Sequence, residues 1–320
     1  MKFMTLVVAA TSTALSSGIA FAADKVVVGY SVGATALPYY VGVEQGIFEK
    51  HDLEIEGVKI VVNSNLQSAL IANQIDAAAV MLAVEGMAAN VIKPGSVNYI
   101  SLNAQSSDYR MEQFVARPDA GVKELADFKG KKLVTSPGIG NMSVAVAALT
   151  AAGLNEGDYT LDQLDTAQHI NVLTSGQHDG AFTLEPAATL MMHNGVAGLI
   201  KAGVVAEVVL GDPKADAYMA GGAISQAFLT ERPDVAKRYK EAFDEAIDTI
   251  HAHPELAREA LAKYTPTPPE IVNEVPLVKF TKLSDLTDVD IESFQKYIDF
   301  AVSIGTVAEP IDVKPFLAKF

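Results

Sequence analysis

The sequence predicts an α/β protein built from two mostly parallel sheets flanked by helices. Short apolar runs bounded by turn residues alternate with amphipathic helical patterns along most of the chain, which is typical of parallel strands connected by helices. The 320 residues are 49% hydrophobic, enough for two lobes of ordinary size. The chain has no cysteine, so its stability is expected to come from buried apolar area rather than from disulfides.

Nine apolar runs are predicted as strands, and helical patterns lie between them. The strands are expected at residues 25–30, 54–61, 77–80, 97–102, 113–117, 131–135, 180–183, 206–210 and 223–229. The helices are expected at residues 39–49, 66–72, 86–92, 143–152, 170–175 and 186–193.

The C-terminal part is predicted to be helical. Apolar residues from Val235 to Ile250 recur at helical spacing, and charged residues occupy the opposite face. Pro254 opens a second helix, which the proline-rich stretch 265–269 ends. A last helix is expected at 291–304.

The first 22 residues have the pattern of a secretory signal peptide. Lys2 supplies a positive charge, residues 6–10 and 14–19 supply apolar character broken by Thr and Ser, and Ala20-Phe21-Ala22 fits a small-x-small cleavage site. The apolar run is shorter than the ~20 residues of a membrane span. Without a cysteine there is no site for a lipid anchor. We therefore expect a mature protein that is free in the periplasm and not embedded in the membrane.

Several functions are disfavoured by charge or by missing motifs. A net charge of -15 argues against nucleic acid and anionic membranes as partners. The six histidines show no metal-ligand spacing, and the chain has neither a GxxxxGK[ST] loop nor a GxSxG turn. We expect a protein that binds without catalysis and needs no metal or cofactor.

Several stretches, taken in order, resemble one known family. They are residues 37–55 (LPYYVGVEQGIFEKHDLEI), 67–77 (QSALIANQIDA), 122–135 (VKELADFKGKKLVT), 170–186 (INVLTSGQHDGAFTLEP) and 228–257. Each is weak alone, but together they cover most of the chain. The sequence resembles the periplasmic solute-binding proteins of ABC importers, in the family for nitrate, sulfonate, taurine and thiamine precursors.

The resemblance implies a bilobal, type II periplasmic-binding-protein fold with two hinge crossings. The chain is expected to cross outward near 103–110 and back near 218–222. Lobe 1 would then contain residues 23–104 and 219–320, and lobe 2 residues 105–218. A ligand that contacts both lobes stabilises the closed form, which a permease with its ATPase would recognise. The protein is expected to be a monomer.

Candidate ligand contacts in lobe 1 follow the first two strands, where helix N-termini meet a cleft. The first group is Ser31, Gly33, Ala34 and Leu37. The second is Asn63 and Asn65 with Ser64 between them, which can equally cap the following helix.

In lobe 2, the loop 135–143 joins a buried strand to a helix of small residues. Its candidate ligand contacts are Ser136, Gly140, Asn141 and Ser143. The loop does not match the glycine pattern of a dinucleotide-binding motif, because residue 143 is a serine where that pattern requires a third glycine. Thr183 and Glu185, at the end of the strand 180–183, are the last candidates in lobe 2. Glu185 can cap the next helix instead of touching ligand, unless the ligand has an amine.

Arg110 lies in the expected outward crossing. Its planar guanidinium can bind a carboxylate or sulfonate through two hydrogen bonds, and the alternative is an ion pair with Asp108 or another acid. Tyr218, with Tyr39, Tyr40 and Tyr109, can supply apolar walls with polar tips, although at least two of the four are expected in the core.

The sequence therefore predicts periplasmic capture of a small organic anion (a sulfonate, a taurine-like compound or a carboxylate) and its delivery to an ABC permease. Three alternatives remain open. The ligand can be a thiamine-precursor pyrimidine or a nitrate-like ion. The protein can be a sensor subunit, or an enzyme on the same fold.

Overall fold

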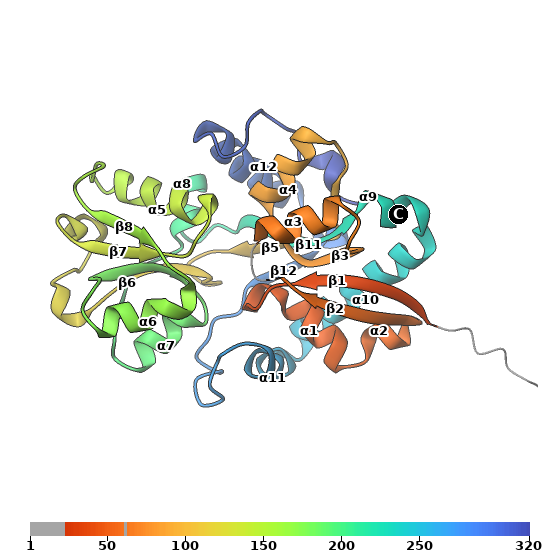
Figure 1. The fold of residues 1–320 in the computed structure, drawn as a ribbon, viewed down its shortest axis with the longest axis horizontal. Coiled ribbons are helices and arrows are strands. Elements are labelled where there is room, and N and C mark those ends of the chain that lie inside the picture. Colours follow the sequence, from red (N-terminus) through yellow and green to blue (C-terminus); the bar gives the residue numbers. More distant parts are fainter. Residues whose placement is uncertain (1–22, 61–62) are drawn as a thin grey trace, which may run out of the picture.

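The computed structural model describes residues 23–60 and 63–320, and in it the chain forms two α/β lobes around two separate sheets (Figure 1). We call the seven-stranded sheet and its helices lobe 1, and the five-stranded sheet and its helices lobe 2. The predicted signal peptide lies outside the described residues. No helix in the described ranges has both the length and the apolar character of a membrane span.

The sheet of lobe 1 has the strand order β12-β5-β11-β3-β1-β2, with β4 also paired to β11. Strands β1, β2 and β3 are parallel, whereas β11 is antiparallel to β3, β4 and β5, and β12 to β5. The strands are β1 (Asp24–Tyr30), β2 (Leu53–Lys59), β3 (Ala77–Leu82), β4 (Val97–Tyr99), β5 (Ser101–Gln105), β11 (Ala217–Ser225) and β12 (Lys279–Lys282).

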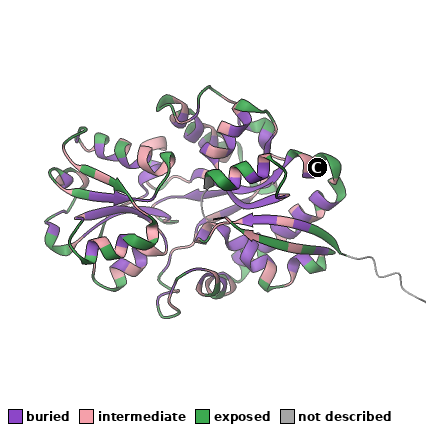
Figure 2. Ribbon diagram, viewed as in Figure 1, coloured by how far each residue is buried: buried purple, intermediate pink, exposed green. Residues whose placement is uncertain are grey.

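Helices cover both faces of this sheet because successive strand residues point to opposite sides. Val26 and Val28 pack into the core beneath α1 and α10, whereas Val27 packs against the core on the opposite face. Buried residues are prominent along the strands inside both lobes (Figure 2). The helices of lobe 1 are α1 (Leu37–Glu44), α2 (Ile47–Lys50), α3 (Asn63–Ile71), α4 (Ala83–Ile92), α9 (Gln226–Glu231), α10 (Pro233–Ala252), α11 (Pro254–Tyr264) and α12 (Asp288–Ser303).

The sheet of lobe 2 has the order β10-β6-β9-β7-β8, with α5 on one face and α6 and α7 on the other. Phe114 and Phe182 face the α5 side, and their neighbours Val115 and Ala181 face the α6–α7 side. The elements are β6 (Glu112–Ala116), β7 (Lys132–Thr135), α5 (Ile139–Ala151), β8 (Thr160–Gln163), α6 (Thr166–Thr174), β9 (Gly180–Leu184), α7 (Ala187–His193) and β10 (Gly198–Ala202).

The chain passes between the lobes twice, through residues 106–111 and residues 203–216, and the two segments touch. The backbone N–H of Ser107 donates to the carbonyl of Pro213 at 2.7 Å. Gly203 lies beside both, with φ +67, and a Cβ there would be 2.4 Å from the Pro213 carbonyl oxygen and 2.9 Å from the Ser107 nitrogen. The backbone atoms of Pro213 and Ser107 therefore leave no room for a side chain at 203, and the positive φ also favours glycine at this position.

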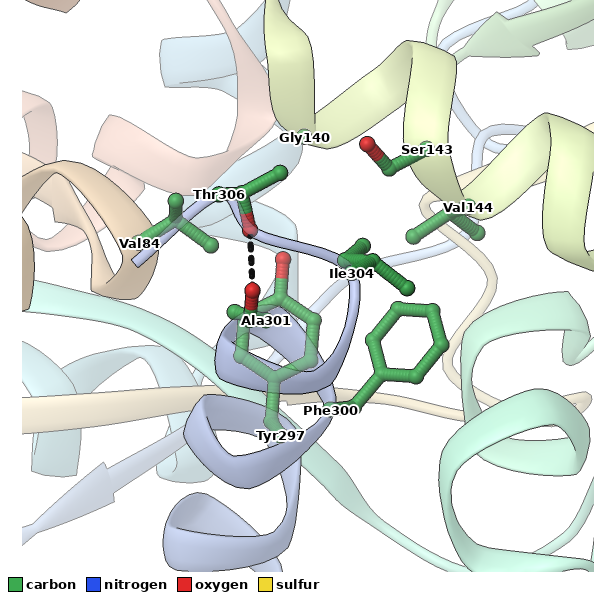
Figure 3. A pocket seen from close by; sticks show the side chains of 9 residues that line it. All are labelled: Val84, Gly140, Ser143, Val144, Tyr297, Phe300, Ala301, Ile304 and Thr306. Atoms are coloured by element: carbon green, nitrogen blue, oxygen red, sulfur yellow. Dashed lines mark hydrogen bonds between the residues drawn. The ribbon is translucent and has the colours of Figure 1, made fainter. Parts of the chain in front are cut away.

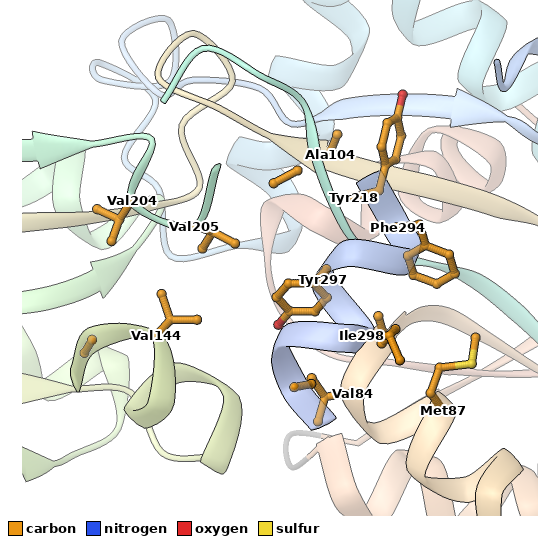
Figure 4. Packing of buried hydrophobic residues seen from close by; sticks show 14 of the residues in the cluster. Val84, Met87, Ala104, Val144, Val204, Val205, Tyr218, Phe294, Tyr297 and Ile298 are labelled. Carbon is orange, nitrogen blue, oxygen red and sulfur yellow. The ribbon is translucent and has the colours of Figure 1, made fainter. Parts of the chain in front are cut away.

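The second connection also contains α8 (Val204–Leu210), which packs between the lobes. Val204 and Val205 of α8 and Val144 of α5 belong to the same apolar cluster as Phe294, Tyr297 and Ile298 of α12 (Figure 4). On the other side of the molecule, Nδ1 of His193 at the end of α7 lies 3.1 Å from Oε1 of Glu274. The lobes are thus in contact on both sides of the crossings.

Most predicted elements are confirmed, and four expectations were wrong. The sheets are mixed rather than mostly parallel, because the strands next to the crossings run back against their neighbours. The run 206–210 is part of helix α8, bounded by the left-handed Gly203 and Gly211; so short an apolar run does not distinguish strand from helix. The expected strand 223–229 is the end of β11 followed by α9.

The expected return crossing at 218–222 lies inside β11. Gly221 lets another strand approach closely here, since a Cβ at 221 would be 1.9 Å from the Ser101 carbonyl oxygen. Sequence reasoning also missed β8, β10 and β12. The lobe boundaries at 104/105 and 218/219, which fall in the ends of β5 and β11, remain a proposal.

The contact at Gly203 gives a first prediction. Gly203→Ala should lower the free energy of unfolding by roughly 2–4 kcal/mol, because the new methyl group overlaps backbone atoms of both crossings. Gly211→Ala is the matched control: Gly211 also has a positive φ, +78, but a Cβ added there would have no neighbour within 4 Å. The control should lose only roughly 1–2 kcal/mol for the left-handed conformation. Urea unfolding of both variants measures this, and equal losses would contradict the proposed overlap.

Candidate functional site

The candidate site lies at the junction where strand-end loops of the two lobes face each other. Helix α4 begins after β3 in lobe 1, and α5 begins after β7 in lobe 2. Val84 of α4 and Gly140 and Ser143 of α5 line one small hollow together with residues of α12 (Figure 3). Crevices outside the carboxyl ends of strands are where α/β proteins bind ligands.

The hollow itself is small. Its volume is about 10 Å³, close to that of one water-sized sphere, and Tyr297 and Phe300 of α12 form much of its wall. The hydroxyl of Thr306 donates to the Ala301 carbonyl at 2.8 Å beside it (Figure 3). The lobes are therefore in direct contact here, and a solute has to separate them to enter at this point.

The first strand-end loop of lobe 1 offers mainly backbone groups. The side chains of Ala34 and Leu37 are fully buried in the core. The carbonyl of Ser31 accepts a hydrogen bond from the Tyr40 hydroxyl at 2.8 Å. The Asn103 side chain donates to the Thr35 carbonyl at 3.3 Å. Gly33 is extended at φ 175, which any residue can adopt. The loop is thus fastened to β5 next to the outward crossing.

The second predicted group lies inside a helix rather than before one. Helix α3 begins at Asn63, so Ser64 and Asn65 belong to its first turn, and both are exposed. The side chain of Asn63 is outside the described part of the structure. The Ser64 carbonyl accepts from the Ser68 hydroxyl at 2.8 Å. This start is earlier than the expected one near Leu66.

In the loop 135–143, polar side chains mostly bond within lobe 2. Ser136 is buried, and its hydroxyl oxygen lies 2.6 Å from that of Thr166. The Asn141 side chain donates to the Pro137 carbonyl at 3.3 Å. Gly138, with φ +123, precedes α5, and its N–H donates to the Gln163 side chain at 3.1 Å. Of the predicted residues in this loop, Gly140 and Ser143 reach the interlobe hollow.

Glu185 and Thr183 are held by neighbouring side chains. Oε2 of Glu185 accepts from the Thr189 N–H at 3.1 Å, and Oε1 accepts from the Gln113 side chain. The capping role considered for Glu185 therefore fits its geometry. Thr183 is buried, with its hydroxyl 2.8 Å from Nδ1 of His169. That contact holds the Thr183 side chain on the α6 side of the sheet.

Arg110 is half-buried at the junction and close to Glu185. Burial raises the pKa of the Glu185 carboxyl, while its hydrogen bonds and the positive charge of Arg110 lower it. The ion-paired arginines of the described chain are Arg117, Arg232 and Arg238, so Arg110 does not pair with Asp108. Arg110 thus forms no ion pair in the described chain, and Glu185 is an acid close to it.

The four tyrosines divide as expected between core and surface. Tyr39, Tyr40 and Tyr218 are buried, and Tyr109 is 41% exposed on the outward crossing. The Tyr218 hydroxyl lies 3.1 Å from the hydroxyl of Thr281 inside lobe 1. The side chain of Tyr218 therefore packs in the core, because it belongs to a central strand rather than to a hinge.

Sequence reasoning missed Glu112, the first residue of β6. Its side chain is only 5% exposed, and Oε2 has no hydrogen-bond partner within the described residues. Burial raises the pKa of Glu112 to about 7, although a hydrogen bond with Gln105 acts in the opposite direction. The only sequence signal is an acid next to an apolar run, which normally indicates an exposed strand end.

A second missed acid, Glu85, comes from the opposite lobe. It lies in the first turn of α4, and its Oε2 is buried without a partner in the described structure. Burial raises its pKa. Burial also raises the pKa of the Tyr297 hydroxyl, and the charges of Glu112 and Glu85 raise it further, so both acids lie near this tyrosine. No group of three or more acids and histidines in the described ranges is arranged to hold a metal.

Comparison with known proteins gives one family match, described as NMT1/THI5 like, over residues 34–257. Among curated proteins, a putative binding protein of Brucella abortus is 25% identical over 223 residues. The match covers 69% of this chain and 65% of the relative, a little less than two thirds of the relative's length.

Solved structures with the same fold cover almost the whole chain. The alkanesulfonate-binding protein SsuA of Xanthomonas axonopodis, bound to MOPS, is 17% identical with a TM-score of 0.71, covering 92% of this chain and 98% of its own. The periplasmic nitrate-binding protein NrtA of Synechocystis is 15% identical with a TM-score of 0.68, covering 91% and 84%. At these identities the likeness concerns the fold, and it confirms the predicted type II periplasmic-binding fold.

The buried state of Glu112 gives a second prediction. With a pKa of about 7 instead of 4.5, the folded protein keeps a proton that the unfolded chain loses between these values. The contribution of Glu112 to the free energy of unfolding therefore falls by roughly 3 kcal/mol as the pH rises from 4.5 to 7, and it stays low above pH 7. Glu112→Gln should raise the free energy of unfolding at pH 8 and have little effect at pH 4.5.

Urea unfolding at several pH values tests this difference. Glu309→Gln, at an exposed position, is the matched control and should follow the parent protein at every pH. Parallel pH profiles for Glu112→Gln and the parent would show that Glu112 is neither buried nor unpaired in solution.

Proposed function

Because this chain belongs to the NMT1/THI5-like family, we propose that it captures a small organic solute between its two lobes and delivers it to the permease of an ABC importer. The observation that carries this proposal is the junction itself, where strand-end loops of two separate α/β lobes meet beside an arginine without an ion-pair partner in the described chain. The secretory pattern of residues 1–22 supports a periplasmic location for the mature protein.

The proposed ligand is a small organic anion: a sulfonate, a taurine-like compound or a carboxylate. Arg110 supports this class because a guanidinium that forms no ion pair in the described chain can bind such a group through two parallel hydrogen bonds. The helix N-termini of α4 and α5 add donor N–H groups on the two sides of the junction.

A second ligand class is favoured by a different observation. Glu112 and Glu85 present buried carboxylate oxygens without partners in the described structure, and such oxygens suit a ligand with N–H groups. An aminopyrimidine, or an anion that also has an amine, would satisfy them. No covalent chemistry is needed for either class, so binding without turnover is part of the proposal.

Capture follows from the two-lobed geometry as a shift between open and closed forms. A solute that contacts both lobes gains more contacts in the closed form, so it stabilises that form by the difference. In the structure, the apolar contact of α5 and α8 with α12 already holds the lobes together on one side. Ligand binding then adds polar contacts at the junction, and the permease recognises the resulting closed form.

The proposal predicts that the right ligand raises the melting temperature. A compound that binds only the folded protein stabilises it by about 2.7 kcal/mol at a concentration one hundred times its Kd. A thermal-shift screen of sulfonates, carboxylates, nitrate and pyrimidines measures this and identifies the ligand class. Conversion of a binding compound to a product, detected as a change in its mass, would point to an enzyme instead.

Arg110 gives a separate prediction for the anionic class. Arg110→Ala should weaken binding of an anion found in that screen by roughly ten-fold or more, and Arg110→Lys should recover part of the loss, since it keeps the charge but not the planar fork. Calorimetry gives the Kd values. Lys237→Ala removes one positive charge from the exposed face of α10 and serves as the matched control. Unchanged affinity in Arg110→Ala would remove Arg110 from the site.

A further inference from the structure

Glu112 is in an unusual position for a carboxylate. It lies at the start of β6, where the chain enters lobe 2, and the pairing of Glu112 with Leu184 places it at the strand-end edge of the sheet. Its side chain is on the same face of β6 as Phe114, two residues later, which belongs to the interlobe apolar cluster. Glu112 is therefore directed at the contact between the lobes.

No basic side chain of the described structure compensates the charge of Glu112 or Glu85. The ion-paired glutamates are at other positions, on the surface of the two lobes. The backbone N–H of Glu112 donates to Oε1 of Gln105 at 3.1 Å. The side-chain oxygen of Gln105 therefore already has a hydrogen-bond partner. A buried carboxylate oxygen without a partner costs free energy, which a donor from a ligand would recover.

Glu85 brings a second free acceptor from the other lobe to the same region. Both acids lie near enough to Tyr297 for their charges to act on its hydroxyl, and Tyr297 lines the hollow between α4, α5 and α12. Acceptors from both lobes that have no partner in the described structure therefore lie near the same tyrosine, which lines the hollow where the lobes meet. A ligand group placed there would contact both lobes, which is the requirement for stabilising the closed form.

We propose that Glu112 is the acceptor for a hydrogen-bond-donating nitrogen of the captured solute, either a protonated amine or the N–H groups of an amidine-like ring, with Glu85 contributing from the opposite lobe. This inference rests on the proposed capture function and specifies its ligand. Arg110 is two residues from Glu112 in sequence, so their Cα atoms are at most about 7 Å apart and one small molecule can reach both residues. A solute with both an acidic group and an amine satisfies the two residues together.

The test compares compounds that differ only in the nitrogen. Taurine and ethanesulfonate form one pair, and 4-amino-2-methylpyrimidine and 2-methylpyrimidine form the other. In calorimetry at pH 7.5, the parent protein should bind the amine-bearing member of at least one pair ten-fold or more tightly. Glu112→Gln should reduce this preference to about three-fold or less, and Glu85→Gln should reduce it in part. Glu309→Gln should leave it unchanged.

A second measurement separates recognition by charge from a structural role. A cation that binds Glu112 favours its ionised form, so binding of the amine at pH 6.5 should release most of one proton from the parent protein and much less from Glu112→Gln. Calorimetry in buffers of different ionisation enthalpy gives the number of protons released. A variant that is merely distorted would weaken both members of a pair equally and leave proton release unchanged.

The outcomes distinguish this inference from the proposed function. Equal binding of both members of a pair by the parent, or an undiminished amine preference in Glu112→Gln, overturns the nitrogen subsite but leaves solute capture intact. If neither member of either pair binds, while the parent binds another compound of the screen that lacks a nitrogen donor, the subsite is likewise overturned. If no compound of the screen binds, capture of these solute classes and the subsite both fail.

Discussion

The contact between the two chain crossings is the constraint on which the rest of the arrangement depends. Ser107 bonds to Pro213, and Gly203 fits against both only because it has no side chain. With the crossings side by side, β5 and β11 stay paired up to the junction, and the strand-end loops of the two lobes are turned toward each other. The site residues come from distant parts of the sequence, and this contact fixes where they can meet.

Two opposite kinds of surface meet at the junction, and their balance suits a protein that opens and closes. The apolar residues of α5, α8 and α12 favour contact between the lobes. The carboxylates of Glu112 and Glu85 oppose it, since their oxygens lose water without gaining partners in the described structure. A closed form that is held by apolar contact but left with unsatisfied acceptors gains most from a ligand that supplies the missing donors.

The family and the α/β class could be read from the sequence because motif order and apolar runs do not depend on distant contacts. Strands such as β1 and β9 and the long helix α10 were predicted for that reason. The failures depend on tertiary contacts. Helix α8 has the composition of a strand, and the expected return crossing at 218–222 lies in a strand where Gly221 permits close strand packing. Arg110 could be proposed from residue type, but the burial of Glu112 results from the partner lobe, which no local pattern reveals.

The order of strands in lobe 1 has a consequence for how the chain folds. Strand β11 lies between β3 and β5 but follows them by more than a hundred residues, after the whole of lobe 2. Lobe 2 is one continuous segment, so its contacts are closer in sequence and can form first. The sheet of lobe 1 is not complete until β11 inserts between β3 and β5, which come much earlier in the sequence. Formation of this late, non-local pairing is therefore the slow step expected on the path to the native state.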